Sequence, residues 1–162
     1  MKPVQPLSQE SCSFVFDQSI DMGEDLEVIS VEGGERIAKA MGDTKLCILR
    51  NHGLLTGGRS PGEAVGWFVM AERVAEVHVK APDAVPISVE AAKPVAHDMS
   101  SPAMAWEVFQ WLARDLVPDP AVVLSWVAHS GEIERGWWAQ MLLRSRDVSL
   151  LQSNRFFGAW VK

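Results

Sequence analysis

Hydrophobic and polar positions predict short strands and one helix in the N-terminal third of the chain. Apolar residues alternate with polar ones over residues 11–20, a pattern typical of a half-buried strand. A β-rich run follows over residues 26–31, and a buried strand flanked by charged residues is expected over residues 45–50. Between these two, residues 32–41 predict a short helix. It is expected to end at Gly42, because glycine readily adopts the left-handed conformation that closes helices.

The best-defined helix of the sequence begins after Ser60 and ends before Pro82. Ser60 is a favourable N-cap, Pro61 suits the first helical position, and Glu63 is placed to complete a capping box. Apolar residues then recur at intervals of three and four, which predicts one buried face. The residues of this predicted face are Ala64, Phe68, Ala71, Ala75 and His78.

Two further helices are expected before the C-terminal stretch. The first covers residues 88–99 and should be broken or kinked at Pro94, because proline lacks the N–H that the helix needs. The second begins at residues 101–102 and ends at residues 118–120. Its predicted buried face consists of Ala105, Phe109, Leu112 and Leu116. Farther along, residues 121–128 fit either a strand or a buried helix, and residues 132–146 are expected to be helical.

Composition narrows the class of protein. The chain has 162 residues, 48% of them hydrophobic, which is enough to bury a core, and a net charge of −6. This acidic balance argues against nucleic acid as a partner, because that affinity comes from lysine and arginine. No apolar run approaches the roughly 20 residues needed to cross a bilayer, so we expect a soluble, cytoplasmic protein without membrane association. Cys12 and Cys47 lack the spacing of a zinc site and are expected to be buried thiols on strands.

The four histidines contain no pair at metal-ligand spacing. His52 is the most informative, because it follows a strand in an Asn-His-Gly turn, where a ring can point into a cleft; a structural role and a functional role both stay open for it. His78 lies on the apolar face of its helix, which favours a hydrogen-bonded histidine of a core or interface. His97 and His129 are expected to have ordinary surface roles.

The unit of helix, strand, Asn-His-Gly turn and helix resembles the class II aldolase/adducin family. The segments that carry this resemblance are residues 37–42, residues 47–58 with the sequence CILRNHGLLTGG, residues 63–64 and residues 71–78. The resemblance implies an α/β fold: a partial class II aldolase-type α/β/α layer with a mainly antiparallel sheet. We accordingly expect a partial domain over residues 1–81 and a helical, tryptophan-rich extension packed on it over residues 82–162.

The resemblance also implies chemistry for His52. In the enzymes of the family the histidine of this turn binds a divalent metal, zinc above all, together with a His-x-His pair and an acid that have no counterpart in this sequence. A catalytic zinc takes three protein ligands and one open position, so His52 alone leaves the site incomplete. His78, His97 or Cys47 are other conceivable ligands, but their spacing in the sequence does not support a shared metal site with His52. Family members are usually tetramers with sites at subunit interfaces, which implies a homo-oligomer or a partner chain that supplies the missing half-domain.

Three hypotheses about function follow. The first is a metal-dependent lyase, of aldolase or decarboxylase type, that acts on a small carbonyl substrate and takes its missing half from an upstream coding segment or a second polypeptide. The second is a non-catalytic or repurposed module for oligomerisation or binding. The third is a metal-independent enzyme of secondary metabolism that holds a hydrophobic substrate against tryptophans, although such residues are more often found in cores and interfaces. These tryptophans are Trp106, Trp111, Trp126, Trp137 and Trp138.

Overall fold

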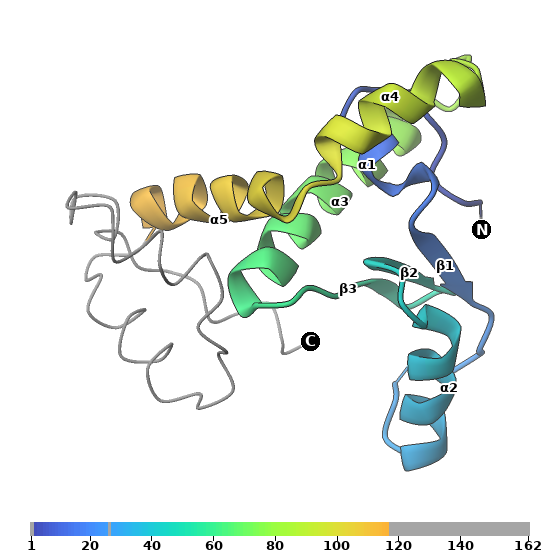
Figure 1. The fold of residues 1–162 in the computed structure, drawn as a ribbon. Coiled ribbons are helices and arrows are strands. Elements are labelled where there is room, and N and C mark those ends of the chain that lie inside the picture. The colour runs from blue at the N-terminus through green and yellow to red at the C-terminus, as the bar shows by residue number, and fades with distance from the viewer. Residues whose placement is uncertain (1, 26, 117–162) are drawn as a thin grey trace. The chain divides into compact units, whose positions relative to one another are not determined.

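The fold is described from a computed structural model of the chain, which places residues 2–25 and 27–116 (Figure 1). The elements in chain order are α1 (Cys12–Val15), β1 (Gln18–Asp21), α2 (Val31–Met41), β2 (Leu46–Leu49), β3 (Gly53–Thr56), α3 (Pro61–Lys80), α4 (Val89–Met99) and α5 (Pro102–Leu116). The chain forms two compact units, residues 1–106 and residues 107–162, and the features below belong to the first unless stated. Among the described residues, no helix combines the length and the apolar character that crossing a membrane requires.

The sheet of the described residues has three strands in the order β1-β2-β3. β1 and β2 are parallel, with Gln18 opposite Leu46 and Asp21 opposite Leu49, and α2 makes the crossover between them and packs beside both strands (Figure 1). β2 and β3 form an antiparallel hairpin in which Leu49 lies opposite Gly53. This mixed architecture confirms the expected α/β class.

The core forms where α1 and α3 meet at large side chains. Phe14 and Trp67 are fully buried and contact each other edge to face, with ring centroids 5.9 Å apart and an interplanar angle of 78°. Met70 and Val74 on α3 are buried next to Trp67 along the helix. One turn before Met70, a Cβ at Gly66 would overlap the backbone carbonyl of Ala105, so the absence of a side chain lets α3 and the start of α5 come into backbone contact.

Two strand predictions near the N-terminus were wrong. Residues 11–20 begin with the short helix α1, and only Gln18–Asp21 is a strand. The Ser11 hydroxyl donates to the Ser8 carbonyl and accepts from the Ser8 N–H, which favours a helical turn. Cys12, Ser13 and Phe14 are buried consecutively, against α4 among others, so the burial does not alternate as in a strand, and Cys12 is a buried thiol on a helix.

The strand expected over residues 26–31 is also absent from the described residues 27–31. Ser30 instead caps α2, with its hydroxyl accepting the Gly33 N–H at 3.0 Å. Ile29 and Val31, the apolar residues that suggested a strand, are 85% and 73% exposed. Side-chain capping by a serine thus outweighs β-propensity here, because no neighbouring strand buries the apolar positions.

The helix ends were predicted correctly. Gly42 closes α2 with φ 52°, and Ser60 caps α3 by accepting the Glu63 N–H at 3.1 Å. The Glu63 carboxylate accepts the backbone N–H of Arg59 rather than that of the cap residue itself.

The buried face of α3 differs from the predicted one. Its buried residues are Gly62, Gly66, Trp67, Met70, Ala71 and Val74. Only Ala71 of the predicted face is therefore buried, and the buried face is the one that brings Trp67 against Phe14.

The last two described helices follow the predictions in part. α4 is capped by Ser88 and continues through Pro94, and its buried residues Ala92 and Ala96 pack with Cys12. On α5, Ala105 and Phe109 are buried as expected, whereas Leu112 and Leu116 are half-buried. The predicted elements of residues 121–128 and 132–146 lie outside the described residues, and the division at residue 81 stays a prediction.

Candidate functional site

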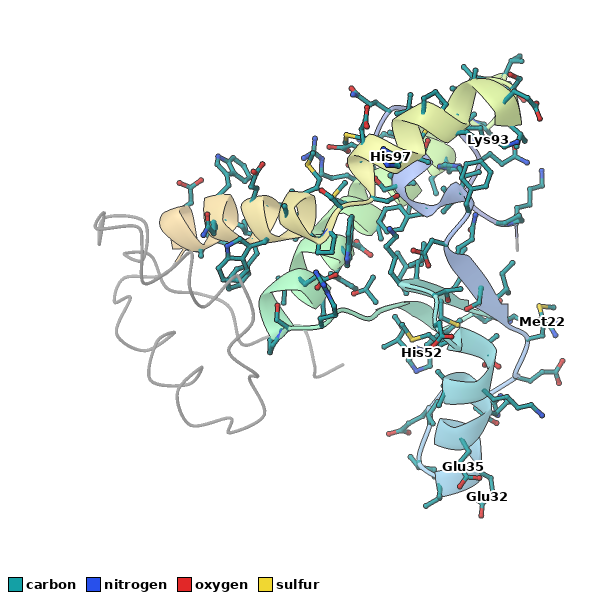
Figure 2. The ribbon with its side chains drawn as sticks, in the orientation of Figure 1. Met22, Glu32, Glu35, His52, Lys93 and His97 are labelled. Atoms are coloured by element: carbon teal, nitrogen blue, oxygen red, sulfur yellow. The ribbon has the colours of Figure 1, made fainter. Side chains whose placement is uncertain are left out.

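The turn from Asn51 to His52 joins β2 to β3 and carries the histidine of the motif. Asn51 has φ 55°, in the left-handed region that asparagine tolerates better than most residues. The His52 N–H donates to the Leu49 carbonyl at 3.1 Å and closes the turn. The side chain of His52 is exposed, and Figure 2 shows it on a different part of the molecule from His97. The turn therefore offers a single imidazole to a ligand that arrives from outside.

Two arginines fix the segments beside this turn. Arg36 of α2 reaches the buried carboxylate of Asp21, with Nε 3.1 Å from Oδ1, and its Nη1 lies 2.6 Å from Oδ2 of Asp25. The Asp21 carbonyl accepts the Arg50 N–H at 3.0 Å, which extends the pairing of β1 and β2 to the edge of the turn. Arg50 in turn places its guanidinium 3.1 Å from the Glu24 carboxylate. The loop after β1 is thus tied to both α2 and β2.

Arg36, Asp21 and Asp25 together form a clamp, and its electrostatics keep Arg36 charged. Hydrogen bonds from its guanidinium to Asp21 first, and to Asp25 second, raise the pKa of Arg36 above its already high ordinary value. A Cβ at Gly23 would overlap the same guanidinium, so a glycine in the loop leaves room for the arginine to lie against the backbone. The Asp21 carboxylate is consequently engaged by a permanent cation and is not a free ligand.

A metal ion is not accommodated by these residues alone. Within residues 2–25 and 27–116, no three His, Cys, Asp or Glu side chains converge in a way that could hold one. A catalytic zinc needs three protein ligands, and the carboxylate near the turn is paired with Arg36. The described part of the chain contributes His52 and does not fit a complete metal centre.

The other candidate ligands lie elsewhere. His78 is hydrogen-bonded at both ring nitrogens: Nδ1 lies 2.8 Å from the Val74 carbonyl, and Nε2 accepts the Gln5 N–H at 2.9 Å. His78 therefore holds the N-terminal segment on α3, as a hydrogen-bonded histidine was expected to do. Cys47 is fully buried in β2, and His97 is exposed beside Asp98. His129 and the tryptophans beyond residue 116 lie outside the described residues.

The clamp around Asp21 was missed at the sequence level. The one signal was an aspartate at the end of an apolar alternation, with arginines at positions 36 and 50. Such pairs form between elements that are distant in the sequence, so spacing rules for single helices or strands do not detect them.

Comparisons with known proteins agree with the fold described above. Among solved structures, the L-fuculose 1-phosphate aldolase from Glaciozyma antarctica PI12 superposes with a TM-score of 0.58 and 29% identity, covering 67% of this chain and 43% of that one. The fold is therefore that of the class II aldolases. Residues 1–79 match the model of the "Class II Aldolase and Adducin N-terminal domain". This part of the chain belongs to the class II aldolase/adducin family.

Two curated relatives come from Streptomyces. One, from Streptomyces roseochromogenus subsp. oscitans, is a 4-hydroxy-3-prenylphenylpyruvate oxygenase/4-hydroxy-3-prenylbenzoate synthase, 30% identical over 112 residues, which are 67% of this chain and 40% of the relative. The other, the decarboxylase NovR of Streptomyces niveus, is 30% identical over 132 residues, which are 75% of this chain and 47% of the relative. The chain spans less than half the length of these relatives.

Proposed function

We propose that this chain acts as part of a lyase of the class II aldolase type, with aldolase or decarboxylase chemistry on a small carbonyl substrate. The observation that carries the proposal is the Asn-His-Gly turn, which exposes His52 at the position where the family's enzymes have a metal ligand. The family match and the decarboxylase and synthase among the relatives support the reaction class. Class II aldolases generally depend on a metal.

The part that His52 plays is to give one neutral imidazole nitrogen to a divalent-metal site, with zinc as the favoured ion. Within the described residues no hydrogen bond engages its ring, in contrast to His78. Because two more donors are required, we propose that they come from another polypeptide segment or another copy of the chain. A homo-oligomer in the cytoplasm is the assembly that we expect, in line with the oligomers that class II aldolases commonly form.

The test is activity and metal content of the protein isolated together with whatever it binds in its source cells. We expect the wild-type assembly to contain zinc and to have retro-aldol or decarboxylase activity. His52→Ala should lose both the zinc and the activity. His97→Ala is the matched control, because His97 is also an exposed histidine and lies away from the turn. Unchanged metal and activity in His52→Ala would refute the role of His52, and an isolated assembly without either lyase activity would refute the reaction class.

A non-catalytic binding module is the second candidate. It is favoured by the finding that residues 2–25 and 27–116 bring no third ligating side chain to any cluster. Under this alternative, the purified assembly contains less than about one-tenth equivalent of metal, far below the one ion of a catalytic site. Sedimentation would then show the same complex for the wild type and for His52→Ala.

A further inference from the structure

A cavity of about 380 Å³ lies at the end of the β2–β3 hairpin opposite His52. Its volume falls in the range of about 300–1,000 Å³ that is usual for small-molecule sites. The residues that the argument uses are Asp17, Lys45, Arg59, Glu63 and Trp67. The strands between the two ends are four residues long, which separates the cavity from His52 by about 13 Å.

Lys45 is a charged side chain buried in the wall of this cavity. It is 9% exposed, its Nζ lies 3.2 Å from Oδ2 of Asp17, and the same nitrogen lies 4.3 Å from the ring centroid of Trp67. The other carboxylate oxygen of Asp17 accepts the Lys45 backbone N–H at 2.9 Å. An ammonium has three N–H donors, and within the described residues its one anionic partner is the Asp17 carboxylate. Lys45 therefore retains donor capacity toward the cavity.

Arg59, which is paired with Glu63, also keeps N–H donors that have no partner among the described residues. Oε2 of Glu63 accepts from the Arg59 backbone N–H at 3.1 Å and from its Nε at 3.3 Å, while Oε1 accepts from the Trp67 indole at 3.3 Å. Both carboxylate oxygens are thus engaged. The terminal nitrogens of Arg59 have no hydrogen-bond partner in the described part of the chain, and the side chain is 64% exposed.

On the cations of these two pairs, N–H donors of Lys45 and Arg59 therefore remain available to a ligand. Planar carboxylates match the parallel N–H groups of a guanidinium. The exposed carboxylate of Asp43 also lines the cavity, which makes three carboxylates against two cations and disfavours a dianion such as phosphate. Met41, Trp67 and Pro102 supply apolar wall. We propose that this cavity binds a small organic monoanion, a carboxylate with an apolar body.

The proposal is independent of the lyase function. The carboxylate would contact Lys45 and Arg59, whereas the proposed reaction uses the opposite end of the hairpin. Failure of either proposal therefore leaves the other unaffected, because His52→Ala removes no group that lines the cavity.

The experiment is an NMR titration of the full chain with sodium benzoate, and with benzamide as the neutral molecule of the same shape. We expect saturable shifts of the Lys45, Gly57 and Gly58 amides with a Kd of about 1 mM or lower. Benzamide should bind at least about tenfold more weakly, because it lacks the negative charge that pairs with the two cations. Equal binding of benzamide, or the absence of saturable shifts with benzoate, would overturn the proposal.

Two substitutions locate the ligand. Arg59→Gln should weaken benzoate binding about tenfold while the protein stays folded, because Arg59 is largely exposed. Arg73→Gln is the matched control, since Arg73 is an exposed, ion-paired arginine on α3 that does not line the cavity. Equal weakening by both substitutions would indicate general electrostatics and overturn the proposal, as would tighter binding of inorganic phosphate than of benzoate.

Discussion

The two ends of the β2–β3 hairpin use ion pairs in opposite ways. At the His52 end, Arg36 is paired with Asp21 at the end of β1 and Arg50 with Glu24 of the following loop, and the side chain of His52 is left exposed. At the other end, Lys45 is buried beside Trp67 and lines a cavity. In the first case the charges position a backbone; in the second the charges themselves face the space that a ligand can enter.

The His52 end of the hairpin can be recognised from the sequence, whereas the cavity end cannot. His52 lies in a contiguous motif, whereas the cavity combines residues from the segments before β1 and before β2, the segment after β3, and α3. Substitutions at each end should therefore separate stability, turn geometry and ligand binding.

The largest effect is expected for Trp67→Ala. Trp67 is 1% exposed and contacts Phe14, so truncation should lower the free energy of unfolding by about 3–5 kcal/mol. Urea unfolding monitored by circular dichroism measures the loss. Trp111→Ala, at a 58% exposed position, should change stability by less than about 0.5 kcal/mol. Similar losses for both substitutions would contradict the assigned core.

Asp21→Asn should destabilise the His52 end. It removes the charge that pairs with Arg36 and keeps the size of a side chain that is 6% exposed. We expect the free energy of unfolding to fall by about 2 kcal/mol. The loss should be smaller than for a fully buried ion pair, because Arg36 is 37% exposed. Thermal unfolding tests this expectation. Asp98→Asn, at an exposed position, is the comparison, and a loss as large there would speak against a specific role of the clamp.

Asn51→Val should strain the turn itself. A β-branched residue at φ 55° costs about 1–2 kcal/mol, whereas Asn51→Gly relieves the same conformation and should be close to neutral. The pair is compared by chemical denaturation, and the amide shift of His52 reports the turn directly. If valine and glycine behave alike, the left-handed backbone is not retained in solution.

The smallest effect is expected for Glu76→Gln, which lies at neither end. The hydrogen bond from Lys80 lowers the pKa of Glu76, so any stabilisation is complete above its ordinary value of 4.5 and is lost as the pH falls through the lower folded-state value. Because the pair is exposed, the melting temperature at pH 7 should not change measurably. A clear decrease at pH 7 that disappears under acid would contradict this.

The sequence predicted what short-range interactions decide. The Ser60 cap, the end of α2 at Gly42 and the strand before His52 depend on neighbouring residues and were correct. The strand expected over residues 11–20 failed because the contact of α1 with α4, far along the chain, decides which residues are buried there. The pairs Arg36–Asp21 and Lys45–Asp17 bridge 15 and 28 positions, so no local pattern indicates them.

The glycine at position 66 has a consequence for how this chain can vary. The backbone carbonyl of Ala105 occupies the space where a Cβ would stand, so a hydrogen atom is all that fits. In a saturation library of α3, we expect this position to accept glycine alone. Exposed positions about two turns away, such as Glu72 and Arg73, should tolerate most residues. The lack of space for a Cβ at position 66 would then limit which natural or designed sequences can keep α3 in contact with the start of α5.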